Sequence, residues 1–135
     1  MRVLASERAE IRAEDDVVRV RHLVRTWATR TGLSLVDQTK LITAASELAR
    51  NTLIYGGGGH LEVETVEAPD GRTGLRLAFV DQGPGIADVA LALTDGYTTG
   101  SGLGLGLSGS RRLVNEFTID SRVGVGTRVS IVKWK

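Results

Sequence analysis

Two glycine-rich stretches in the second half of the sequence would let a ligand approach the backbone closely. They are Asp81-Gln82-Gly83-Pro84-Gly85-Ile86 and the run from Gly100 to Gly109. Glycine inside ordinary secondary structure costs stability, so such a cluster needs a reason. A helix that begins in a glycine run offers free N–H groups and a partial positive charge to a phosphate. The predicted phosphate contacts are glycines of the second run and two hydroxyl donors: Gly102, Gly104, Gly106, Ser108 and Thr127.

The phosphate hypothesis also predicts a divalent cation. No lysine or arginine lies between Asp81 and Gly109, so backbone dipoles alone would leave much of a triphosphate's charge uncompensated. Oxygen ligands suit Mg²⁺. Glu47 and Asn51 are four residues apart in a predicted helix and therefore share a face. This pair could hold the metal or divide the work of base and ligand, although a solvent-exposed pair is the ordinary alternative.

Asp81 ends a predicted strand and is followed by glycines. Its carboxylate could accept a hydrogen bond from an exocyclic amine such as that of adenine, or it could simply initiate a turn. The familiar nucleotide motifs do not fit the sequence. A P-loop needs a lysine after its glycines, and a dinucleotide-binding fingerprint follows a strand directly. The glycines from Gly56 to Gly59 are either a flexible connection or a loop that passes near the ligand.

Composition excludes several other classes of function. The chain has 135 residues, a net charge of +1, no cysteine and 41% hydrophobic residues. The small charge gives no indication of nucleic-acid binding, and the lack of cysteine excludes thiolate chemistry. No apolar run reaches membrane-spanning length, and the N-terminus does not resemble a signal peptide. We expect one domain over residues 1–135, located in the cytoplasm, without contact with nucleic acid or membrane.

The hydrophobic pattern predicts the elements that position these residues. Alternation of apolar and polar residues indicates strands, and a spacing of three or four indicates helices. The predicted strands are 3–12 (an edge strand), 60–67, 75–81, 117–121 and 127–134. The predicted helices are 15–31, 34–55, a short 86–93, and 105–117.

This order predicts an α+β fold, because the sequence contains no repeated strand–helix–strand unit. We expect a two-layer sandwich in which helices cover one face of a mixed, mostly antiparallel sheet. The arginines of helix 15–31 are either a solvated face or a surface for a partner.

The motifs are individually weak, but their order resembles that of the GHKL ATPase superfamily. Glu47-Leu48-Ala49-Arg50-Asn51 is followed by Asp81 to Gly85, then Gly102 to Gly106, then Gly126-Thr127. Within the superfamily, Asp95-Gly96-Tyr97-Thr98-Thr99 and other segments look like the switch serine/threonine kinases of the RsbT type, found in bacterial stressosomes. The resemblance implies the Bergerat ATP-binding fold over essentially the whole chain.

The resemblance also implies roles for individual residues. Glu47 would be the general base, with a place beside Mg²⁺, and Asn51 would be a metal ligand. Asp81 would read the adenine amino group, and residues 87–103 would form a lid over ATP. The implied ATP-binding residues are Asn51, Asp81, Gly83, Gly85, Ile86, Thr98, Thr99, Gly100, Gly102, Leu103, Gly104, Leu105, Gly106, Ser108 and Thr127.

For partners, the resemblance implies STAS-domain proteins like RsbS and RsbR as substrates, and a PP2C-type phosphatase like RsbU that the released kinase activates. An anti-sigma factor of the RsbW or SpoIIAB type, which shares the fold and kinase activity, is the alternative. A third possibility makes phosphatase binding the main output and uses phosphorylation only for release.

Overall fold

The computed structural model describes residues 1–93 and 106–135 of the chain. Strands and helices follow one another in the predicted order. The elements are β1 (Arg2–Ile11), α1 (Glu14–Thr31), α2 (Leu35–Ile54), β2 (Gly59–Glu67), β3 (Thr73–Asp81), α3 (Val89–Ala92), α4 (Gly106–Leu113), β4 (Glu116–Arg122) and β5 (Gly126–Trp134).

The strands form one five-stranded sheet in the order β1-β2-β3-β5-β4. All four neighbouring pairs are antiparallel. The predicted two-layer α+β fold is confirmed, but the word "mixed" was wrong for the described strands. After β3 the chain continues through α3 and α4 to β4. It then turns back as β5, which pairs with β3 in the antiparallel sense.

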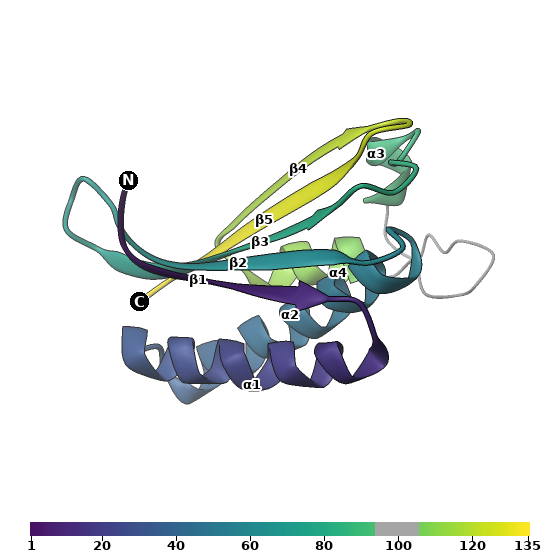
Figure 1. Cartoon of the computed structure of the whole chain (residues 1–135). Coiled ribbons are helices and arrows are strands. Elements are labelled where there is room, and N and C mark those ends of the chain that lie inside the picture. The colour runs from purple at the N-terminus through teal and green to yellow at the C-terminus, as the bar shows by residue number, and fades with distance from the viewer. Residues whose placement is uncertain (94–105) are drawn as a thin grey trace.

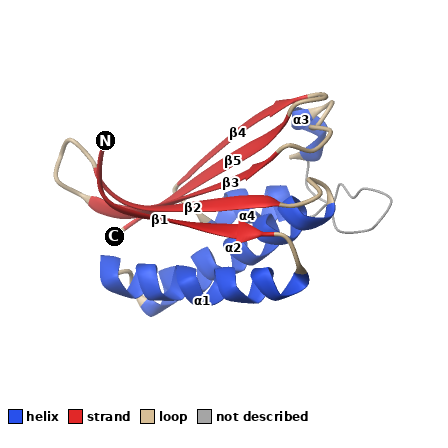
Figure 2. Cartoon of the chain, viewed as in Figure 1, coloured by secondary structure: helices blue, strands red, loops and turns tan. Residues whose placement is uncertain are grey.

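Helices α1, α2 and α4 lie together against one face of the sheet, while the opposite face carries no described helix (Figure 1). Colouring by secondary structure shows the same two layers, with α3 near the turn between β4 and β5 (Figure 2). Of the described helices, none combines the length and apolarity that crossing a bilayer requires.

The core lies between the two layers. The predicted stripe of α1 is buried at Val17, Val20, Val24 and Trp27, and that of α2 at Leu41, Ala45, Leu48 and Thr52. From the sheet, every second residue of β2, β3 and β5 faces these helices. The fully buried sheet residues include Leu61, Val63, Leu75, Leu77, Phe79 and Ile131.

The starts of the two long helices are set by local polar groups. Ser34 caps α2 as predicted, because its Oγ accepts a hydrogen bond from the amide of Asp37 (3.1 Å). In α1 the cap residue is Ala13, whose side chain makes no capping hydrogen bond. Asp16 lies one turn further on and reaches back, accepting hydrogen bonds from the amides of Arg12 and Ala13.

Strand β1 is the predicted edge strand, and the structure explains the break in its alternation. Glu7 occupies a position that the pattern reserves for an apolar side chain. Its Oε1 accepts a hydrogen bond of 2.8 Å from Nε1 of Trp27 in α1. A partly buried indole N–H needs such a partner. The glutamate therefore ties the edge strand to the helical layer.

Helix α4 ends earlier than its sequence predicts, and helix α3 begins later. The helix expected to reach Phe117 ends at Leu113, and β4 already begins at Glu116. Asn115 makes the change of direction: its amide donates to Val132, and its side-chain oxygen accepts from the amide of Trp134. Helix α3 covers only four residues, because Asp88 caps it through the amide of Leu91.

Candidate active site

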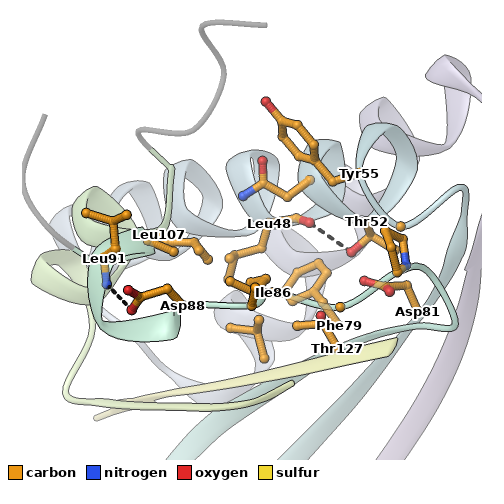
Figure 3. Close-up of a pocket in the computed structure, with 17 residues that line it drawn as sticks. Leu48, Thr52, Tyr55, Phe79, Asp81, Ile86, Asp88, Leu91, Leu107 and Thr127 are labelled. Atoms are coloured by element: carbon orange, nitrogen blue, oxygen red, sulfur yellow. Dashed lines mark hydrogen bonds between the residues drawn. The ribbon is translucent and has the colours of Figure 1, made fainter. Parts of the chain in front are cut away.

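A cavity of about 460 Å³ opens between the C-terminal half of α2, the sheet where β3 ends and β5 begins, and α3 (Figure 3). This volume falls in the range of small-molecule sites. Asp81 lies at one end of the view, Leu91 and Leu107 at the other, and Leu48, Phe79 and Ile86 between them. The remaining lining residues are Asn51, Thr52, Tyr55, Gly56, Pro84, Gly85, Ala87, Asp88, Ala92, Thr127 and Val129.

The polar end of the cavity is built by strand register. Asp81 of β3 pairs with Thr127 of β5, and Thr127 pairs with Ser121 of β4. Directly paired residues point to the same face of a sheet, so these three side chains form one row. Asp81 and Thr127 both line the cavity, so Thr127, predicted as a hydroxyl donor to phosphate, lies beside Asp81.

Asp81 is held in a partly buried position. Its Oδ1 accepts a hydrogen bond of 2.9 Å from the amide of Gly83. Burial raises the pKa of Asp81 above its ordinary value, and hydrogen bonds from the backbone amides of Gly83 and Thr127 oppose that rise. A carboxylate can accept several hydrogen bonds, so Asp81 can accept a further one from an amino group in the cavity.

Glycines pack closely around Asp81. A Cβ at Gly56 would lie 2.5 Å from Cβ and Cγ of Asp81, and one at Gly126 would lie 2.1 Å from its carbonyl oxygen. A Cβ at Gly83 would lie 2.7 Å from Cα of Gly56. Gly126 also has a φ of 147°, which L side chains rarely adopt. The first of the Gly56–Gly59 glycines therefore serves close packing beside the site, which decides between the two alternatives at that residue.

The loop after Asp81 is fixed to the β4–β5 turn. Pro84 accepts a hydrogen bond of 2.9 Å from the amide of Gly124, and the amide of Ile86 donates to Oγ of Ser121 (2.7 Å). Gly85 has a φ of 77°, and a Cβ there would lie 2.4 Å from the carbonyl oxygen of Arg122. The predicted residues Gly85 and Ile86 line the cavity. Gly83 does not line it but orients Asp81.

Helix α2 supplies the other polar wall. Asn51 lines the cavity, whereas Glu47, one turn earlier, is exposed and does not line it. No cluster of three or more His, Cys, Asp or Glu side chains occurs within residues 1–93 and 106–135. Asn51 presents an amide side chain at the cavity, and an amide oxygen is a ligand type that Mg²⁺ accepts.

The predicted phosphate-binding run lies mostly outside the described residues. This applies to Thr98, Thr99, Gly100, Gly102, Leu103, Gly104 and Leu105. Gly106 is the first residue of α4. Ser108 is buried, with 6% of its surface exposed, and is not among the cavity-lining residues; its neighbour Leu107 lines the cavity instead.

Sequence reasoning missed the apolar walls and one polar residue. Leu48, Phe79 and Val129 had been assigned to the core or left unassigned, because a pocket wall and a core face have the same hydrophobic period. Ser121 had no role at all. Its signal is only its place in a strand, and the register that brings it to Thr127 is not visible in the sequence.

Comparisons with known proteins agree with this geometry. Residues 36–135 match the family described as histidine kinase-, DNA gyrase B- and HSP90-like ATPases. The chain is 44% identical, over 92% of its own length and 92% of the relative, to the serine/threonine-protein kinase RsbT of Bacillus subtilis (strain 168).

The chain also has more distant similarities, in sequence to a curated relative and in fold to a solved structure. The chain is 25% identical to an anti-sigma F factor of Thermoanaerobacter sp. (strain X514), over 84% of this chain and 82% of that protein. Its fold is similar to the crystal structure of the RsbU and RsbW domains of Rv1364c from Mycobacterium tuberculosis, with a TM-score of 0.66 at 19% identity. That match covers 97% of this chain and 33% of the other.

Proposed function

The chain belongs to the family of histidine kinase-, DNA gyrase B- and HSP90-like ATPases, and on that basis we propose that it is an RsbT-type serine/threonine-protein kinase that binds ATP in this cavity. The kinds of side chain that line the cavity support the placement of ATP there. The cavity has apolar walls, a half-buried carboxylate and hydroxyl at one end, and an amide side chain on α2. Such a combination fits a nucleotide, which has a flat apolar base and a polar edge.

In the proposed complex, the base lies between Ile86, Phe79 and Leu48. Asp81 accepts a hydrogen bond from the amino group of adenine, and Thr127 lies beside it on β5. The phosphates extend toward the N-terminus of α4 and the residues before it. Asn51 contributes an oxygen to Mg²⁺, which supplies the charge neutralisation that phosphoryl transfer needs.

We assign the proton transfer to Glu47. A hydroxyl oxygen of the substrate forms a bond to the terminal phosphorus of ATP, the bond from that phosphorus to the bridging oxygen breaks, and ADP leaves. The carboxylate of Glu47 takes the hydroxyl proton. The exposure of Glu47 supports this role, because a partner protein must bring the hydroxyl from solvent.

The proposed substrate class rests on the resemblance to switch kinases of the RsbT type. We propose a serine or threonine of an RsbS- or RsbR-like STAS-domain protein as acceptor, and a PP2C-type phosphatase of the RsbU kind as the partner activated afterwards. The anti-sigma F relatives favour a second candidate, in which the chain binds a sigma factor. Their lower identity, 25% against 44%, makes this the weaker proposal. A cytoplasmic location goes with either.

The deciding experiment is transfer of radiolabelled phosphate from ATP to candidate STAS proteins, with a sigma factor tested in parallel. We expect label on a STAS protein. In Glu47→Gln we expect a loss of labelling of at least about 100-fold, the lower end of the range for a general base, and an unchanged affinity for ATP. Asp15→Asn, which removes an exposed carboxylate from α1, is the control and should label normally. Normal labelling by Glu47→Gln would refute the assigned base. A stable complex with the sigma factor and no label on STAS proteins would favour the second candidate.

A further inference from the structure

Ser121 lies directly behind the polar end of the cavity. It is the residue of β4 paired with Thr127, in the row that begins at Asp81. It is partly buried, and it is not one of the residues that line the cavity. Any influence on a ligand must therefore act through its neighbours.

One neighbour is the backbone of Ile86. The amide of Ile86 donates to Oγ of Ser121 over 2.7 Å, so this N–H is already committed and cannot serve a ligand. The bond holds the loop that carries Gly85 and Ile86 against β4. It therefore fixes the position of the Ile86 side chain in the cavity wall (Figure 3).

The other neighbour is the hydroxyl of Thr127, whose Oγ1 lies 2.8 Å from Oγ of Ser121. The hydrogen of Ser121 has two acceptors within reach, Oγ1 of Thr127 and the carbonyl oxygen of Gly126 at 3.4 Å. A separation of 2.8 Å is ideal for a hydroxyl donor, whereas 3.4 Å is long. Either hydroxyl could donate across this contact, and donation by Ser121 is the arrangement that leaves the hydrogen of Thr127 for a ligand in the cavity.

We propose that Ser121 is a positioning residue of the nucleotide site, which makes Thr127 a hydrogen-bond donor beside the acceptor Asp81. This inference rests on the proposed function. An acceptor and a donor side by side match the edge of a 6-aminopurine, which presents an amino donor next to a ring-nitrogen acceptor. A 6-oxopurine presents the reverse pattern and leaves both groups unpaired.

The test compares binding of ATP and inosine triphosphate to the full chain, by calorimetry, in Ser121→Ala, Ser121→Thr and the wild type. We expect Ser121→Ala to weaken ATP binding about 3- to 10-fold, the range for one neutral hydrogen bond, and to weaken inosine triphosphate less. The preference for ATP then falls. Ser121→Thr, which keeps the hydroxyl, should restore it. Thr118→Ala, on the same strand but pointing to the other face, should change neither affinity.

A double-mutant cycle with Thr127→Val separates positioning from a general role in folding. If Ser121 acts through the Thr127 hydroxyl, Ser121→Ala adds little further loss of preference in the Thr127→Val background. In transfer assays Ser121→Ala should raise KM for ATP and leave kcat unchanged. Thermal unfolding is measured first, and Ser121→Cys replaces Ser121→Ala if the alanine variant does not fold.

The outcomes also separate this inference from the proposed function. If the wild type binds no ATP, the proposed function fails and the inference fails with it. If the wild type binds ATP but Ser121→Ala weakens both nucleotides equally, or its effect adds to that of Thr127→Val, only the role of Ser121 is refuted.

Discussion

Two neighbouring rows cross the helix-facing side of the sheet. One consists of Leu61, Phe79, Val129 and Ile119, and the next of Gly59, Asp81, Thr127 and Ser121. The backbone pairing is the same in both. The first row packs under α2, whereas the second lies where α2 ends at Ile54 and the chain turns away. Apolar side chains fill the covered row, and polar side chains with close-packed glycines occupy the uncovered one.

The difference shows how the site is positioned. The apolar row supplies stability and a wall of the cavity through Phe79 and Val129. The polar row supplies recognition and costs stability, because Asp81 is partly buried and its pKa is raised by that burial. Changes in the two rows should therefore separate into effects on folding and effects on ligand binding.

The largest effect is expected one row deeper in the core. Leu77 is fully buried, and Leu77→Ala should reduce the free energy of unfolding by about 2–5 kcal/mol. Binding of ATP by the fraction that remains folded should keep its wild-type affinity. Urea unfolding measures the stability, and calorimetry measures the ATP affinity. A loss of affinity in folded Leu77→Ala would contradict the separation between residues that stabilise the fold and residues that bind the ligand.

Asp81→Asn should weaken ATP binding without lowering stability. Its amide puts a donor where the carboxylate presents an acceptor, so ATP affinity should fall about 10- to 100-fold, as for a lost hydrogen bond to a charged group. Stability near neutral pH should not fall, because a neutral side chain is buried in place of a charge. Unchanged affinity in a binding titration would refute the role of Asp81.

Gly56→Ala should disturb both properties moderately. The new Cβ would meet Asp81 at 2.5 Å and the carbonyl oxygen of Thr52 at 2.6 Å. We expect a loss of about 1–3 kcal/mol in stability, as for overpacking, together with weaker ATP binding, because Asp81 must shift. Gly109→Ala is the control, since a Cβ there meets nothing within 4 Å, and it should not destabilise the chain. Equal losses of stability and ATP affinity in the two variants would show that close packing at Gly56 does not matter for either property.

The smallest effect is a pH dependence. Burial raises the pKa of Asp81 in the folded chain above its ordinary value, so the folded chain binds more protons in the pH interval between the two pKa values. The stability that protonated Asp81 contributes at acid pH is therefore lost as pH rises through the folded pKa. Relative to Asp81→Asn, the wild type should be more stable near about pH 3 than at pH 7. Urea unfolding of both proteins across this range checks the sign, and a reversed trend would contradict the burial of Asp81.

Much of this architecture was predictable because its signals are local. The periodic stripes of α1 and α2, the Ser34 cap and the edge strand follow from neighbours within a few residues. The start of α3 and the end of α4 were predicted wrongly, since Asp88 begins α3 and Asn115 follows α4 through contacts that helical propensity does not register. The order of the motifs indicated the ATPase family, and Asp81 and Asn51 were found in that way.

The sequence by itself determined which residues form each element, and through its motifs the family. Only the tertiary structure decided that Asp81, Thr127 and Ser121 form one row, that Gly56 packs on Asp81, and that Glu7 pairs with Trp27. The physical reason is range. Hydrophobic period and capping act between residues close in the chain, whereas strand register and close backbone approach join residues that are far apart in it and are fixed only when the two layers pack.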